Sequence, residues 1–160
     1  MGLNLSHDNL KADLLEFLGS HPAHVNAKKS FQDLKPENRH KRVENFTHTI
    51  WEELEHLHLA QEDILRYMLT PDWKSPKWLE GYWPIEKENI SDEEWNNSLN
   101  GFFADLEEVQ EFVTNSKIDI TKKIPHTQNH SYLREILLIM DHNAYHLGKV
   151  VEMRKALKDW

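Results

Sequence analysis

The stretch from Ser131 to Leu157 constrains the fold more than any other part of the chain. Its apolar residues recur at spacings of three and four, which places them on one face of a long α-helix. A helix with such a face must bury it against other elements, so partner helices are expected elsewhere in the chain. The predicted buried stripe consists of Leu133, Ile136, Leu137, Met140, Ala144, Leu147, Val150 and Val151.

Three further stretches have the same helical periodicity: residues 6–18, about 49–69 and 91–115. The segments Thr49 to Glu52 and Ser91 to Glu94 each match the capping box, in which a hydroxyl and a carboxylate satisfy free amides at a helix start. Long connections separate these helices, and the sequence has no internal repeat. The pattern predicts an all-α fold with one domain over residues 1–160, a four-helix bundle with long crossover loops.

Gly148 lies inside the last predicted helix. A glycine at such a position costs a helix roughly 1 kcal/mol relative to alanine. We therefore expect another helix or a second subunit to approach closely there.

The composition excludes several classes of protein. The 160 residues include no cysteine, which excludes disulfides, thiolate metal sites and a cysteine nucleophile in this chain and suits the cytoplasm. The 19 Lys and Arg residues against 27 Asp and Glu residues give a net charge of −8, which argues against a nucleic-acid partner. No apolar run approaches the roughly 20 residues of a membrane span, and the N-terminus lacks the pattern of a secretory signal. We predict a cytoplasmic protein with no membrane partner.

Two connections have an unusual composition. Residues 28–42 are locally basic, which is typical of a solvated loop, although an anion-binding lip is the functional alternative. The Trp73–Trp83 loop holds three tryptophans and Tyr82, and loops are rarely so aromatic unless they cover something. It is either a lid or pocket wall, or a loop that packs over the bundle and closes its end.

His142 and His146 lie four residues apart in the last predicted helix. Side chains at this spacing share one helix face, so the two imidazoles can bind one metal ion. A bare pair of this kind is more often explained by surface histidines, and it leaves the site incomplete. His56 and His58 flank the buried stripe of the second helix on opposite sides, each about 100° from Leu57. Periodicity alone does not choose between them as the third ligand.

A set of three imidazoles without cysteine suits zinc, nickel, copper or ferrous iron. Three such ligands leave a fourth coordination position for water or substrate, as catalytic zinc sites do. Carboxylates close to the rings would orient the imidazoles. The candidates by helical position are Glu52, Glu55, Asp63 and Asp141.

Several motifs together resemble a known family. The segment from Asp141 to Val151 is similar to the last helix of the DinB-like superfamily, a group of four-helix proteins that includes bacillithiol and mycothiol transferases. The segment His48 to Leu57 resembles the second helix of that family. Ser75 to Trp78 and Gly81 to Pro84 resemble the linking loop of one subgroup. The resemblance covers nearly the whole chain.

The resemblance implies a set of ligands, a cofactor and an assembly. Carried over by position, the ligands of a divalent metal ion, whether zinc, nickel or iron, are His56, His142 and His146. His56 is preferred to His58 because it follows a Leu-Glu step and precedes a leucine, as in the family pattern. The resemblance also implies a homodimer.

The function implied by the resemblance is that of a metal-dependent transferase with a small-molecule thiol and an electrophile as substrates. The absence of cysteine suits a mechanism in which the co-substrate brings the thiol. A small metal-dependent hydrolase that activates water is the close alternative. A non-enzymatic metal-binding stress-response protein and a structural bundle whose histidines bind nothing are the others.

Overall fold

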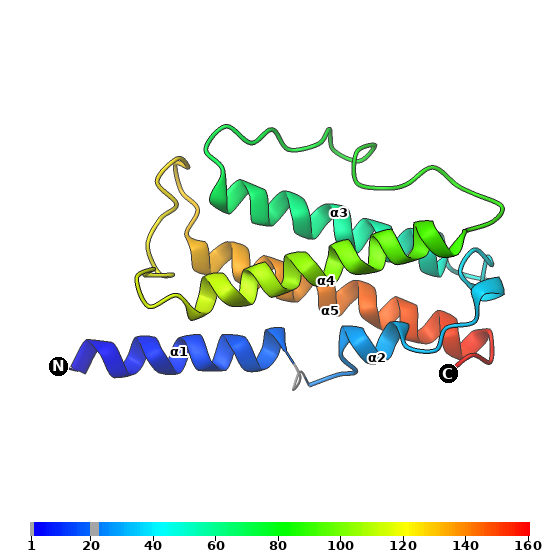
Figure 1. Cartoon of the computed structure of the whole chain (residues 1–160), viewed down its shortest axis with the longest axis horizontal. Coiled ribbons are helices and arrows are strands. Elements are labelled where there is room, and N and C mark those ends of the chain that lie inside the picture. The colour runs from blue at the N-terminus through cyan, green and yellow to red at the C-terminus, as the bar shows by residue number, and fades with distance from the viewer. Residues whose placement is uncertain (1, 20–22) are drawn as a thin grey trace.

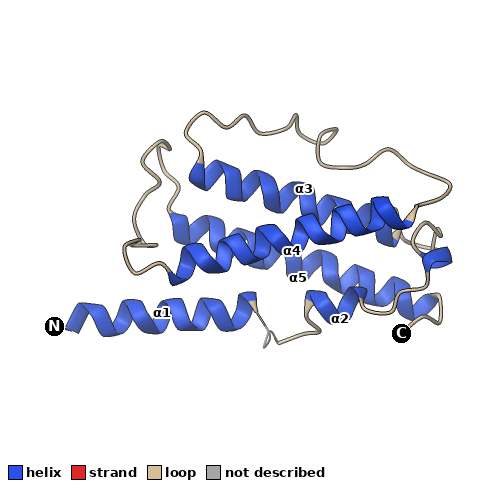
Figure 2. Ribbon diagram, viewed as in Figure 1, coloured by secondary structure: helices blue, strands red, loops and turns tan. Residues whose placement is uncertain are grey.

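A computed structural model describes residues 2–19 and 23–160, with side chains from residue 7 onward. Within these residues the chain has five α-helices, one short 3-10 helix at Pro36–Asn38 and no β-strand (Figure 2). The predicted all-α class is confirmed. The α-helices are α1 (Gly2–Leu18), α2 (Ala27–Phe31), α3 (Ile50–Leu69), α4 (Asp92–Thr114) and α5 (Tyr132–Ala156).

The long helices form the predicted four-helix bundle. Helix α3 packs against α4 and α5, while α1 packs against α4. The short helix α2 packs against α5. In Figure 1, α1 and α2 lie end to end along one side of the α4–α5 pair, and the connection from α3 to α4 runs along the opposite side of the bundle. The bundle therefore places α3 and α5 side by side, with the long loop next to α3.

Local sequence signals explain where the helices begin. The Thr49 hydroxyl accepts a hydrogen bond from the Glu52 amide, and the Glu52 carboxylate accepts one from the Thr49 amide at 2.7 Å. Ser91 and Glu94 make the same reciprocal pair at the start of α4. Both predicted capping boxes are confirmed. The prediction for the first helix is less accurate, because α1 begins at Gly2 rather than near residue 6.

The predicted buried stripe of α5 is mostly confirmed, with one error. Leu137 is 48% exposed, whereas Ile139 is buried. The buried face follows Ile136, Ile139, Asn143 and Leu147, and Leu137 lies about 100° around the helix from Ile136. The buried residues form two clusters, one near each end of the bundle. Helices α3, α4 and α5 contribute to both, α2 to one and α1 to the other.

At Gly148 no other helix of the described chain approaches closely, so that alternative is wrong, and a second subunit stays a prediction. A Cβ atom at Gly148 would meet nothing within 4 Å. The approach occurs instead at Gly101 on α4, where a Cβ atom would lie 2.3 Å from His58 Nε2. Gly101 thus leaves room for the His58 ring between α3 and α4.

Among the helices described, none combines the length and the apolar character needed to cross a membrane.

Candidate metal centre

The fold brings three histidines together, His56 from α3 with His142 and His146 from α5. Each offers one ligand nitrogen, and these nitrogens all lie within 4.8 Å of one another. The Nε2 atoms of His56 and His142 are 3.0 Å apart. We call these three residues the histidine cluster. It contains the set that the resemblance named, and the role of its members as ligands stays a prediction.

His58 points elsewhere. Its ring lies over Gly101, and its nitrogens lie 3.6 Å from the Glu55 carboxylate and 4.0 Å from that of Asp105. His58 therefore belongs to the α3–α4 contact and not to the histidine cluster.

Fixed acceptors set the tautomers of two rings in the cluster. His56 Nδ1 donates a hydrogen bond to the backbone carbonyl of Tyr82 at 2.8 Å. His146 Nδ1 lies 2.5 Å from Glu53 Oε2, which accepts its proton in the same way. With Nδ1 as the donor, the neutral form of each ring keeps its lone pair on Nε2. Such outer partners orient imidazoles for metal binding.

Two rings of the cluster, those of His56 and His142, are held in their neutral forms. Burial lowers the pKa of His56 to about 4 and that of His142 to about 3. The Coulomb interaction with the neighbouring His146 lowers both pKa values further. Near neutral pH these rings therefore carry no charge, and neutral imidazole is the form that binds metal.

The Trp73–Trp83 loop forms one wall of the cluster. The Trp83 ring stacks on His56 with centroids 3.9 Å apart and an interplanar angle of 3°. Its other face stacks on His48 at 3.6 Å. At the same place the Tyr82 carbonyl binds His56, so the loop orients this imidazole through both a hydrogen bond and a ring contact.

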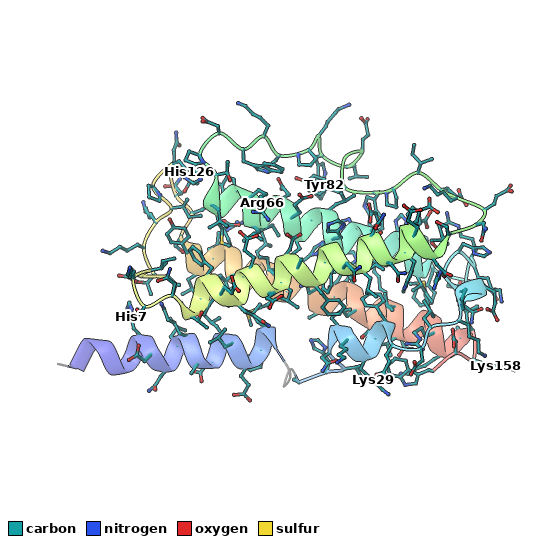
Figure 3. All side chains as sticks on the ribbon, viewed as in Figure 1. His7, Lys29, Arg66, Tyr82, His126 and Lys158 are labelled. Atoms are coloured by element: carbon teal, nitrogen blue, oxygen red, sulfur yellow. The ribbon has the colours of Figure 1, made fainter. Side chains whose placement is uncertain are left out.

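Asp63 holds this loop against α3. One carboxylate oxygen accepts a hydrogen bond from Trp73 Nε1 at 2.7 Å, and the other accepts one from the Tyr82 hydroxyl at 2.7 Å. Burial and the Asp63 contact raise the pKa of Tyr82 to about 12, so the hydroxyl stays a donor. Figure 3 shows Tyr82 on the loop beside α3. Trp78, by contrast, is exposed, and its ring lies against Tyr82 with the two centroids 5.7 Å apart. The pocket-wall interpretation describes Trp83, while Trp73 and Tyr82 anchor the loop to the bundle.

The carboxylate that contacts the cluster is one that the sequence analysis missed. Glu53 is buried and binds His146, whereas in the described chain no hydrogen bond joins the proposed Glu52, Glu55, Asp63 or Asp141 to the three imidazoles. Glu53 precedes His56 by three residues, which places both on one face of α3. This three-residue spacing was the sequence signal from which the contact of Glu53 with the cluster could have been predicted.

The basic segment 28–42 has a structural role at two of its arginines. Arg39 is buried, its guanidinium donates to Asp92, and it lies over the Trp95 ring. Arg42 donates to both oxygens of Glu52. The interpretation of the whole segment as a solvated loop is therefore wrong for Arg39.

The residues of the cluster fit a divalent metal ion. Two adjacent imidazole nitrogens at 3.0 Å require something between their lone pairs, either one shared proton or one bound cation. Three imidazole nitrogens, with two of the rings oriented by hydrogen bonds at their Nδ1 atoms, are a suitable donor set for such an ion.

A separate cavity of about 540 Å³ lies between α1, α2, α4 and α5. Its walls include Leu18, Phe102, Asn143 and Leu147, and no member of the histidine cluster lines it. The cavity and the cluster are therefore different features of the bundle.

The fold and the cluster together define a class: a helical bundle in which histidines from two facing helices form a potential metal centre. The sequence model of the DinB superfamily matches residues 23–150, which is more than half of the chain, and the protein belongs to that superfamily. Comparison with the curated proteins and with the solved structures gave no match.

We expect Glu53→Gln to weaken metal binding about 10- to 100-fold, the usual effect of losing an outer partner of a metal ligand. The side-chain carbonyl of the glutamine can still accept a hydrogen bond from His146 Nδ1, but the substitution removes the negative charge beside the ring. Competition with a chromophoric chelator measures the affinity. Glu55→Gln is the matched control, because it removes the same charge from the same helix next to His58 instead. Equal losses in both variants would mean that Glu53 has no special role.

Proposed function

We propose that His56, His142 and His146 bind a divalent metal ion, and that the protein is a metal-dependent transferase for a low-molecular-weight thiol. The observation that carries the proposal is the convergence of three imidazole nitrogens within 4.8 Å in a member of the DinB superfamily. Zinc, nickel and iron all suit this donor set. The homodimer and the cytoplasmic location remain predictions from the sequence.

A bound divalent ion with an open coordination position lowers the pKa of a thiol or water attached to it. The chain supplies the surroundings for this chemistry. Burial keeps His56 and His142 neutral, Glu53 holds the His146 ring, and Trp83 keeps water from one face of His56. Since the chain has no cysteine, the reacting thiol must come with a substrate.

The test begins with the metal content of protein purified without an affinity tag. The protein is then assayed for conjugation of 1-chloro-2,4-dinitrobenzene to small thiols, with and without prior removal of metal by a chelator. We expect about one ion per chain and a conjugation rate that is lost with the metal and restored by its return. A metal-loaded protein that hydrolyses activated esters or amides at the same rate with and without thiol would instead be a hydrolase. Filled coordination without turnover would indicate a non-enzymatic metal-binding protein.

A further inference from the structure

Aromatic rings cover one side of the histidine cluster, and part of its α5 side is exposed. Trp83 and His48 stack over the His56 side. On the α5 side His142 is partly exposed, and Tyr145, whose ring meets His146 edge-on at 4.9 Å, is 64% exposed. The exposed side chains of α5 therefore lie where a small molecule can approach the cluster.

Lys149 lies on this exposed side of the cluster. Its ammonium lies 4.5 Å from the centre of the Tyr145 ring and 3.5 Å from Glu53 Oε1. Its charge is among the causes that lower the pKa values of His48, His56 and His142, as expected for a cation next to the cluster. The side chain is partly exposed, so the ammonium can contact both the protein and an incoming ligand.

The contact with Glu53 leaves Lys149 incompletely neutralised. Glu53 binds His146 at 2.5 Å with one oxygen, and its other oxygen is at the long limit of a hydrogen bond to Lys149. An ammonium has three donors, and among the described residues one of them is used, in the contact with Glu53. A cation at this position also repels a metal ion, so it is not explained by metal binding.

We propose that Lys149 recognises an anionic group, such as a carboxylate, on the thiol that binds at the histidine cluster. The inference rests on the proposed function and narrows its substrate to anionic low-molecular-weight thiols. Lys149 thus selects the ligand, while the histidines hold the ion.

Cobalt-loaded protein provides the test, because thiolate binding to cobalt(II) gives a charge-transfer absorption that can be titrated. The probes are 3-mercaptopropionate and 2-mercaptoethanol, which are close in size and differ in a carboxylate against a hydroxyl. We expect Lys149→Gln to weaken 3-mercaptopropionate binding about 5- to 10-fold, as for loss of a charge-assisted hydrogen bond. Binding of 2-mercaptoethanol should change little in this variant. In the unsubstituted protein, added salt should weaken the binding of 3-mercaptopropionate and not that of 2-mercaptoethanol.

Two further variants separate recognition from structure. Lys149→Arg keeps the charge and should keep most of the preference. Lys155→Gln removes the same charge from the last turn of α5, where Lys155 pairs with Glu152, and should behave as the unsubstituted protein. Cobalt affinity should stay the same or rise in Lys149→Gln, because a repelling cation is lost, whereas a purely structural role would lower cobalt affinity as well.

The outcomes distinguish this inference from the proposed function. Failure of the unsubstituted protein to bind cobalt, or to give a thiolate band once loaded, would overturn both. Cobalt and thiol binding with the same ratio of the two thiol dissociation constants in Lys149→Gln and in the unsubstituted protein would overturn the role of Lys149 alone.

Discussion

Metal binding should be lost in His142→Ala, with an affinity at least about 100-fold below that of the unsubstituted protein, beyond the range typical of outer partners. His142 supplies one of three nitrogens, and the remaining pair leaves an incomplete site. The Nε2 atom of His56 also loses its neighbour at 3.0 Å. Chelator competition measures the affinity, and elemental analysis of the purified variant measures the metal content per chain. Thiol conjugation should disappear in parallel.

Two other histidines serve as controls for this substitution. His24 is exposed and its only hydrogen bond in the described structure is to a neighbouring backbone carbonyl, so His24→Ala tests for nonspecific binding by surface imidazoles. His58→Gln tests the rival that periodicity could not exclude. Retention of full metal affinity by His142→Ala, or an equal loss in His58→Gln, would show that the histidine cluster is not the metal site.

Most of the fold could be predicted because its signals are local. Capping boxes fix the starts of α3 and α4, and apolar periodicity fixes their buried faces. The start of α1 at Gly2 was missed, because the predicted cap at Ser6 is not where the helix begins. The exposure of Leu137 was missed because it borders the buried face, and an apolar residue there does not show which way the helix faces. For Gly148 the inference from a helix glycine to a close helix contact was wrong, and Gly101 made that contact instead.

Some features of the histidine cluster could likewise be predicted from local sequence, whereas others required the fold. The spacing of His142 and His146 showed that they share a helix face, but it did not show what lies opposite. The choice of His56 over His58 needed either the resemblance or the packing of α3 between α4 and α5. Tyr82 and Trp83 act on His56 through the path of an irregular loop, which has no periodicity from which to predict a contact. Glu53 was predictable from its spacing to His56.

We expect the metal-free protein to lose stability as the pH falls from about 6.5 to 4. The pKa of His56 is lowered to about 4 and that of His142 to about 3, against about 6.5 in the unfolded chain. Between these values the unfolded chain binds more protons than the folded one, so the free energy of unfolding rises with pH. After allowance for solvent screening and for coupling between the rings, the loss is on the order of 3 kcal/mol. Above pH 7 both rings are neutral in both states and contribute no pH dependence.

Two other histidines contribute to the pH dependence of stability, and their contributions have opposite signs. Burial lowers the pKa of His48, which adds to the loss in acid. Glu55 raises the pKa of His58, whose stabilisation is present at low pH and is lost as the pH rises, so it opposes the trend. Carboxylates titrate mainly below pH 5, which leaves the interval from pH 6.5 to 5 to the histidines.

Urea unfolding of the metal-free protein at pH 7, 6 and 5 measures this slope, and His142→Gln isolates one contribution to it. Glutamine does not titrate, so the variant should show a clearly smaller loss of stability between pH 6.5 and 5 than the unsubstituted protein. A variant at His24, which is exposed, should leave the slope unchanged. An unaltered slope in His142→Gln would mean that the folded protein accepts a proton on His142 as easily as the unfolded chain does. In that case burial would not keep the cluster neutral, and protons would compete with the metal throughout this pH range.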